Sequence, residues 1–136
     1  MNFWIFQAVS DRYDLREIGI IKTGKKVTWY ATRYRSRMSI GDTVFFWLGG
    51  TEDIRGIYGR GKLISTPYKK PEWDAYGIDV EYEQRVDPHV SVQEIRKIEA
   101  LQDLLILRAP QATNFLLTTS EGRAIMELVA LRKKGV

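Results

Sequence analysis

The chain has 136 residues, 44% of them hydrophobic and 28% charged, which suits one globular domain spanning residues 1–136 with a single core. It has no cysteine, which excludes disulfides, thiolate metal sites and cysteine nucleophiles, and its one histidine excludes the usual imidazole-rich metal cages. The N-terminus lacks the features of a signal peptide and no apolar run reaches membrane-spanning length, so we expect a cytoplasmic protein with neither a metal nor a membrane partner.

The first half of the chain is predicted to be mostly strand. Apolar, aromatic and β-branched residues indicate strands over residues 3–9, 25–32, 43–48 and 54–64. The third of these is apolar throughout, which is typical of a strand buried on both faces. Glycines at 56, 59 and 61 permit sharp bending in the fourth, as a curled or barrel-like sheet requires. Between the first two strands, Ser10 can cap a short helix that ends near Ile18.

The second half adds one long strand and the helices. Residues 78–86 alternate apolar and charged side chains, and Asp87-Pro88 is predicted to end that strand. Helices are expected after the capping boxes that begin at Ser91 and Thr118. Residues 104–107 fit either a short helix or a strand, and residues 114–117 fit a short strand. The sum is an α+β domain in which five or six strands curl into a barrel-like sheet flanked by short helices.

Positive charge is concentrated in one segment. Six of the 21 basic residues and no acidic residue lie between Ile18 and Gly41, so the remaining 15 bases are outnumbered by the 17 acids. Such a cluster fits a surface that contacts nucleic-acid phosphates, although a solvated basic loop would have the same composition. The candidates for phosphate contacts are Lys25, Lys26, Arg33, Arg35 and Arg37.

The four tryptophans differ in their sequence context. Trp4 lies among apolar neighbours and is predicted to be core, whereas Trp47 ends the buried strand and fits either core or the floor of a pocket. Trp29 enters the basic segment and Trp73 lies in a polar loop that contains prolines, so both are harder to explain as core. Aromatic faces beside basic residues are typical of nucleobase stacking, although a loop tryptophan can also cover a small apolar cluster.

No catalytic group is evident. The sequence contains no convincing triad, metal-ligand set or cofactor loop, and no serine in a nucleophile-elbow context. Glu81 and Glu83 share a predicted solvent-facing strand face and do not look like a tuned pair of carboxylates. We therefore expect a binding module without a cofactor.

Four segments resemble the EVE domain of the PUA-like superfamily, which is related to the YTH readers of methylated adenine. They are Trp29–Thr32, Gly41–Trp47, Gly56–Gly61 and Leu107–Phe115, and the resemblance extends from Phe3 through the final helix. It implies a PUA-like curled β-sheet, or pseudo-barrel, with an aromatic cage. Such a cage accepts a flipped-out or single-stranded base, such as a modified cytosine or adenine in DNA or RNA, and performs no chemistry on it.

The resemblance also implies the residues of the cage. Trp29 and Trp73 would form its two walls, and each Trp→Ala variant is expected to bind more weakly without unfolding. Related domains often have an asparagine shortly after the first tryptophan, where this chain has Thr32-Arg33-Tyr34. The candidate base-binding residues are Trp29, Tyr30, Ala31, Thr32, Trp47, Trp73, Thr113 and Asn114.

Two other functions remain open from the sequence. Gly24–Thr28 resembles, more loosely, the motif of the ASCH branch of the same superfamily, some members of which hydrolyse acylated cytidine; Lys26 and Thr28 would match its lysine and threonine. Alternatively, the exposed aromatics could serve a protein partner. The choice between DNA and RNA, the preferred base and the oligomeric state do not follow from the sequence.

Overall fold

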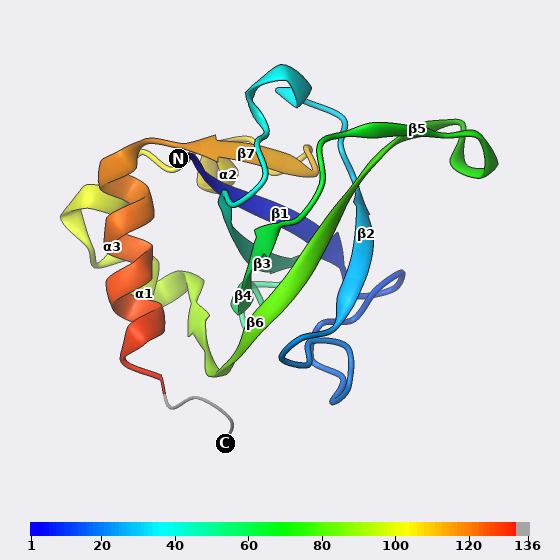
Figure 1. Ribbon diagram of the computed structural model, residues 1–136. Helices are drawn as coiled ribbons and strands as arrows, with labels where there is room; N and C mark the ends of the chain where they lie inside the picture. The colour runs from blue at the N-terminus through cyan, green and yellow to red at the C-terminus, as the bar shows by residue number, and fades with distance from the viewer. Residues whose placement is uncertain (133–136) are drawn as a thin grey trace.

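Seven strands form one mixed sheet in the computed structural model, which describes residues 1–132 (Figure 1). The sheet order is β2-β6-β4-β3-β1-β7, with β5 paired to β6; β1 and β3 run parallel and the other pairs antiparallel. The strands are β1 (Phe3–Val9), β2 (Lys26–Tyr30), β3 (Thr43–Gly49), β4 (Gly56–Leu63), β5 (Tyr68–Lys70), β6 (Ala75–Ser91) and β7 (Asn114–Leu117). The α+β class is confirmed. The sequence missed β5, which has only three residues and lies between two prolines.

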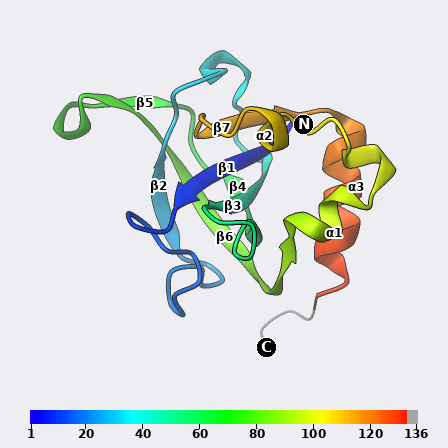
Figure 2. The same ribbon diagram turned by 180° about the vertical axis from the view of Figure 1, so that it is seen from behind.

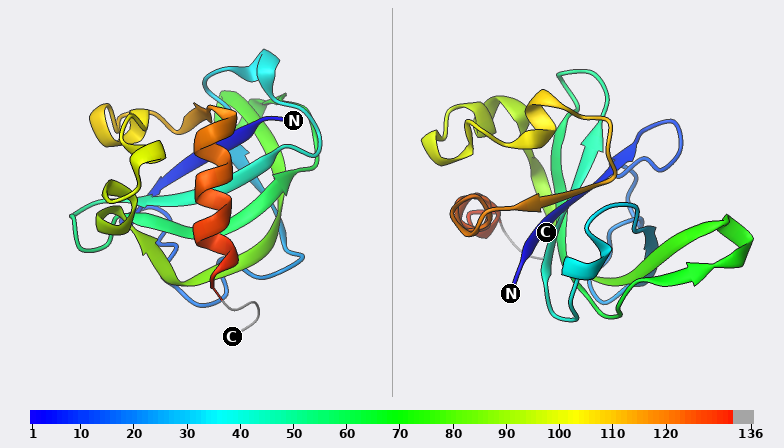
Figure 3. Two further views of the ribbon diagram at one scale, coloured as in Figure 1. Left: turned by 90° about the vertical axis from the view of Figure 1, so that its left-hand side faces the viewer. Right: turned by 90° about the horizontal axis from the view of Figure 1, so that it is seen from above.

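The helices are short and cover one face of the sheet (Figure 3). Helix α1 is Val92–Arg96, α2 is Leu105–Arg108 and α3 is Thr119–Ala130; three 3-10 turns are η1 (Arg35–Arg37), η2 (Pro71–Trp73) and η3 (Glu99–Leu101). Both predicted capping boxes are confirmed, with Ser91 and Thr118 accepting from the third-residue amides at 3.1 Å each. No helix within residues 1–132 is long and apolar enough to span a membrane.

Two apolar cores lie on opposite faces of the sheet, because side chains alternate along each strand. The single core expected from the chain length is therefore wrong. Along β3, Val44, Phe46 and Leu48 enter the core enclosed by the curled sheet. Phe45 and Trp47 instead pack on the helix side, with α1 and α3. This two-sided burial explains the uninterrupted apolar run in the sequence, as predicted.

The predicted end of the long strand at Asp87-Pro88 is wrong. Strand β6 continues to Ser91, and its pairing with β4 shifts register between Ile57↔Val90 and Gly59↔Arg85. The proline therefore lies in a bulge where no ladder hydrogen bond is required of it, and the sheet bends there. A second register shift lies at Gly61, where a Cβ would overlap the carbonyl oxygen of Glu81, so glycine permits the close approach of β4 and β6.

The predicted helix over residues 10–18 is also wrong, since this segment forms a series of turns. The amides of Arg12 and Tyr13 both donate to the Val9 carbonyl. The Arg85 guanidinium donates to the carbonyls of Leu15 and Arg16, at 3.0 Å each. Tertiary contacts with β6 thus satisfy backbone groups that a helix would have satisfied internally, which the local sequence could not indicate.

Candidate functional site

The curl of the sheet brings its two edge strands, β2 and β7, together at Asn114. This side chain is fully buried, and its amide group hydrogen-bonds to the backbone of the opposite edge as a neighbouring strand would. Its Oδ1 accepts from the Thr32 amide at 2.8 Å, and its Nδ2 donates to the Tyr30 carbonyl at 3.0 Å. Asn114 therefore closes one end of a seam between the two edges of the half-barrel.

Asn114→Ala is expected to lower the free energy of unfolding by about 1–3 kcal/mol, because it leaves the Tyr30 and Thr32 backbone groups without their partners. Urea unfolding followed by circular dichroism measures the change. Asn2→Ala is the matched control, because the Asn2 side chain makes one exposed hydrogen bond, to the Arg37 carbonyl. Equal stabilities of the two variants would show that Asn114 does not hold the seam.

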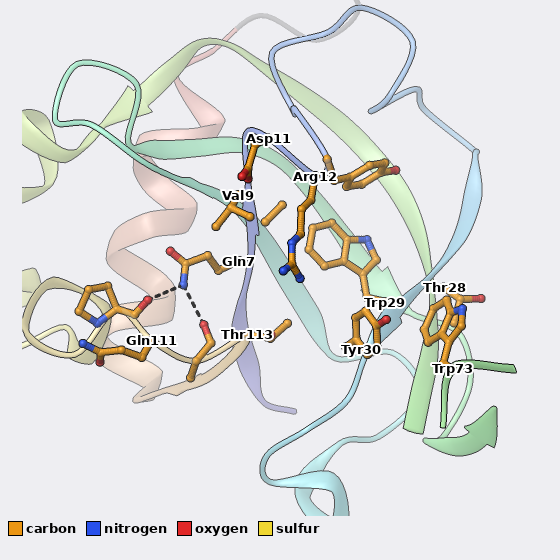
Figure 4. Close-up of a pocket in the computed structure, with 14 residues that line it drawn as sticks. Gln7, Val9, Asp11, Arg12, Thr28, Trp29, Tyr30, Trp73, Gln111 and Thr113 are labelled. Carbon is orange, nitrogen blue, oxygen red and sulfur yellow. Dashed lines mark hydrogen bonds between the residues drawn. The ribbon is translucent and has the colours of Figure 1, made fainter. Parts of the chain in front are cut away.

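A pocket of about 750 Å³ opens along the rest of the seam (Figure 4), a size within the usual range of about 300–1,000 Å³ for small-molecule sites. The end of β1 and the turn after it form one side, and β2 with Trp73 forms the other. The loop before β7 closes the third side. The lining residues are Gln7, Ala8, Val9, Asp11, Arg12, Tyr13, Thr28, Trp29, Tyr30, Trp73, Pro110, Gln111, Ala112 and Thr113.

Trp29 forms the inner wall of the pocket and is only 7% exposed. Its ring packs against Phe46 and Tyr13, with centroids 5.2 and 5.7 Å away. Its Nε1 donates to the Tyr82 hydroxyl at 3.1 Å, and that hydroxyl lies 3.3 Å from the hydroxyl of Tyr13. The indole is therefore held in the wall by packing and by one buried hydrogen bond.

Tyr82 is expected to make the domain sensitive to alkali. Burial raises the pKa of its hydroxyl above the usual value, so the folded state keeps a proton that the unfolded chain releases above about pH 10. The free energy of unfolding should therefore fall as pH rises past 10, by about 1.4 kcal/mol per pH unit for this group. Tyr82→Phe should remove one such contribution, leaving that of Tyr58, whose pKa burial also raises. Urea titrations between pH 8 and 11 test this, and an identical slope in wild type and variant would refute it.

Trp73 forms the outer wall. It lies in η2 and packs against Tyr30 in a tilted arrangement, with ring centroids 4.6 Å apart and an interplanar angle of 34°. The ammonium of Lys70 lies 4.8 Å from the Trp73 ring centroid. A Cβ on Gly77 would lie 2.8 Å from the Thr28 methyl and 3.3 Å from the Trp73 ring, so glycine leaves room for this packing. Trp73 thus rests on the surface of β2, outside the main cores.

Along the edge of β2, backbone groups that have no partner within residues 1–132 face the pocket. The Ala31 amide and the Lys25 carbonyl pair with β6, so the backbone N–H and C=O groups of the odd-numbered residues point toward that strand. The backbone groups of the even-numbered residues point toward the seam, because the direction of these groups alternates along a strand. Asn114 takes the Tyr30 carbonyl and the Thr32 amide. The next pair along the edge, the Thr28 carbonyl and the Tyr30 amide, faces the pocket.

Gln7 fixes the loop that forms the third side. Its Nε2 donates to the carbonyls of Pro110 and Ala112 at 3.0 and 2.8 Å, and its backbone amide donates to the Thr113 carbonyl at 2.8 Å (Figure 4). Across the pocket, the Arg12 side chain extends toward the Trp29 ring. Sequence reasoning missed both residues. Gln7 lies in a strand of apolar pattern and Arg12 in a wrongly predicted helix, so neither carried a visible signal.

Comparison with known families decides the classification. The family model of the EVE domain matches residues 2–128. The chain belongs to the EVE domain family. This confirms the resemblance seen in the sequence and, with it, the PUA-like fold. No match is found among curated protein sequences.

Solved structures share this EVE fold at low sequence identity. A hypothetical protein from Leishmania major has a TM-score of 0.75 at 17% identity, covering 96% of this chain and 95% of that one. Human THYN1, in complex with DNA containing 5-methylcytosine, has a TM-score of 0.73 at 14% identity, with 98% and 100% covered. The apo YTH domain of Toxoplasma CPSF4 has a TM-score of 0.62 at 17% identity, with 98% and 89% covered.

Four of the eight candidate base-binding residues line the pocket of this EVE domain: Trp29, Tyr30, Trp73 and Thr113. Thr32 and Asn114 instead bond to each other at the closed end of the seam, and Ala31 is buried beside them. Trp47 does not form the pocket floor. It is fully buried in the core between the sheet and the helices, because its position in β3 points away from the face that carries Trp29.

The predicted phosphate-binding residues form two groups at opposite ends of β2. Lys25 and Lys26 lie at its start, where the Lys25 ammonium donates to the Gly19 carbonyl at 3.2 Å. Arg33, Arg35 and Arg37 follow its other end, and Arg35 and Arg37 lie in η1. All five are exposed. The pocket lies between the two groups, beside residues 28–30.

Of the two residues of the ASCH-like alternative, one lines the pocket and the other does not. Thr28 lines the pocket of the EVE domain, and its hydroxyl donates to Asp79 Oδ1 at 2.6 Å. Lys26 does not line the pocket and pairs in register with Glu81 of β6. Within residues 1–132, histidine, aspartate and glutamate form no group of three that could hold a metal ion.

Proposed function

We propose that this EVE domain is a non-catalytic reader that takes one modified base of a nucleic acid into the pocket between β1 and β2. The observation that carries the proposal is the convergence of Trp29, Tyr30 and Trp73 on one pocket beside an unpaired strand edge. Aromatic walls supply stacking of about 1–3 kcal/mol per base, and polar groups at the edge supply orientation.

The edge of β2 suggests how a base is oriented. The amide of Asn114 spans one carbonyl and one amide of this edge. The Watson–Crick edge of cytosine or adenine also has a donor next to an acceptor. It can therefore hydrogen-bond to the next two groups along the edge, the Thr28 carbonyl and the Tyr30 amide. The Asn114 amide bonds to the Tyr30 carbonyl and the Thr32 amide in the same way. In this arrangement the backbone reads the base, and the side chains of Trp29 and Trp73 hold its faces.

The fold relatives support a modified base in particular. The THYN1 structure holds DNA that contains 5-methylcytosine, and YTH domains share the fold. One methyl group buried in an apolar pocket contributes about 1 kcal/mol, which is roughly a fivefold preference. Larger discrimination requires that the pocket also excludes other shapes or leaves polar groups unpaired with the wrong base.

A binding screen tests the proposal. The protein is titrated with nine-nucleotide single strands, in DNA and RNA form, that differ only in the central base: cytosine, 5-methylcytosine, 5-hydroxymethylcytosine, adenine or N6-methyladenine. Tryptophan fluorescence reports binding, because Trp29 and Trp73 both line the pocket. We expect at least one modified strand to bind about fivefold or more tightly than its unmodified control. Equal affinity for every strand would refute modified-base reading.

Two additions to the screen, an incubation with N4-acetylcytidine and a salt series, separate the two alternatives. An ASCH-like hydrolase would release cytidine from N4-acetylcytidine, and Lys26→Ala would abolish the release. Lys26 lies outside the pocket lining, which favours the reader. A protein-interaction module would bind all strands alike and would lack the salt dependence that phosphate contacts produce.

A further inference from the structure

One corner of the molecule concentrates cations on aromatic rings. All five cation–π pairs found in residues 1–132 lie there, in the loop after β2 and in the arm formed by β5, η2 and the start of β6 (Figure 1). The four tyrosines that are at least one-third exposed are also here: Tyr30, Tyr34, Tyr68 and Tyr76. We call the part of this corner that does not line the pocket, residues 31–37, 66–72 and 74–77, the aromatic arm surface.

The arm has two faces, since side chains alternate along paired strands. Lys69 pairs in register with Tyr76, and the Arg35 guanidinium lies 4.2 Å from the Tyr76 ring centroid. Lys70 is on the other face, near Trp73 and the pocket. The face that carries Tyr76 therefore lies on the opposite side of the arm from Lys70 and Trp73. Tyr76 does not line the pocket.

Arg35 is held in a defined position. Its guanidinium lies on the Tyr76 ring, and Nη1 makes long hydrogen bonds of 3.4 and 3.5 Å to the carbonyls of Ala31 and Thr32. The guanidinium donors on Nε and Nη2 are left for a phosphate. The backbone is also constrained here: Tyr34 and Asp74 are the two non-glycine residues with positive φ, 57° and 50°, in the part of the chain that the structure describes.

We propose that the aromatic arm surface is a second binding site, which holds the unpaired strand flanking the base in the pocket. Arg35 and Lys69 contact phosphates, and neighbouring bases stack on Tyr34 and on the part of the Tyr76 ring that Arg35 leaves exposed. This inference rests on the proposed function, because a base bound in the pocket determines which nucleotides of the strand reach the arm. The exposed rings favour a single strand over a duplex, because the faces of paired bases are covered by their neighbours whereas those of an unpaired strand are open to stacking.

Comparison of a long and a short ligand tests this site. The long ligand is a fluorescein-labelled strand of nine nucleotides with a central 5-methylcytosine, and the short ligand is 5-methylcytidine monophosphate. Arg35→Ala and Tyr76→Ala should each weaken binding of the long ligand about tenfold and leave binding of the short ligand unchanged. For Arg35→Ala, the slope of log affinity against log salt should fall by about 0.7, the loss of one single-strand phosphate contact.

Arg123→Ala is the matched control. It removes the same charge from the exposed face of α3, on the far side of the sheet from the arm (Figure 2), and should leave both affinities unchanged. Thermal unfolding of each variant confirms that the fold is retained, as the exposure of Arg35 and Tyr76 leads us to expect.

The outcomes distinguish this proposal from the proposed function. If both arm variants bind the long strand like wild type, or if a fully paired duplex binds as tightly as the single strand, the arm site is refuted while the pocket proposal stands. Should the arm variants weaken long-strand binding while the central base and its modification have no effect, the arm site is supported and the reader function fails. If the wild type binds no strand, both fail.

Discussion

Trp29→Ala is expected to unfold the domain or leave it marginal, in addition to removing base binding. The indole is buried against Phe6, Phe46 and Tyr13, and truncation of a buried tryptophan costs about 3–5 kcal/mol. Total stabilities of such domains are about 5–15 kcal/mol. The structure therefore corrects the expectation, based on the sequence, that this variant would only lose binding.

Trp29→Phe separates the two effects. It keeps a ring in the inner wall but removes the hydrogen bond to Tyr82 and part of the stacking face. We expect affinity for the preferred modified strand to fall about threefold to tenfold, within the range of one stacking contact. Calorimetric titration measures the change.

Trp4→Phe is the matched control for Trp29→Phe. Trp4 belongs to the same core, does not line the pocket, and also donates its indole hydrogen bond to a buried partner, Asp42 Oδ2, at 3.0 Å. Its replacement should destabilise the fold to a similar extent without changing affinity. If both variants lose affinity equally, the loss reflects the stability of the core, and Trp29 is not a wall of the site.

Trp73→Ala should have the opposite profile. Trp73 packs on Tyr30 and Lys70 at the surface, so its loss should change the free energy of unfolding by less than about 1 kcal/mol. Loss of one stacking wall should lower affinity for the modified strand by about 1–3 kcal/mol, or roughly 5- to 150-fold. Fluorescence anisotropy of a labelled strand measures this effect.

Trp73→Tyr tests whether stacking is the cause. It retains an aromatic face at the outer wall and should recover most of the affinity lost in Trp73→Ala. Weak binding by both variants, with unchanged stability, would mean that the indole acts in some other way than as a stacking surface. Wild-type affinity in Trp73→Ala would remove it from the site altogether.

The sequence predicted those parts of the fold that local patterns encode. Alternation and apolar runs gave β1 and β7 with their observed bounds, and the capping boxes gave the starts of α1 and α3. The errors lie where tertiary contacts decide. Arg85 satisfies carbonyls of residues 15 and 16 from a distant strand, and the bulge opposite Tyr58 lets Pro88 remain within β6.

The site was predictable only in part. The family resemblance implied eight base-binding residues, of which Trp29, Tyr30, Trp73 and Thr113 line the pocket and the other four do not. Its remaining wall depends on the curl that brings β1 beside β2, a long-range arrangement that no local pattern encodes. The position of Trp47 could not be predicted for the same reason. Side chains alternate along β3, but the sequence does not show which face of the sheet the helices cover.

Mapping of bound nucleotide by NMR tests the central claim most directly. Uniformly nitrogen-15-labelled protein is titrated with the monophosphate of the modified nucleoside that the screen selects. We predict saturable shifts at the Trp29 indole N–H and at the amides of Thr28, Tyr30, Gln111 and Thr113, which surround the pocket. Shifts confined to the helix side of the sheet, or none that saturate, would contradict insertion of a base between β1 and β2.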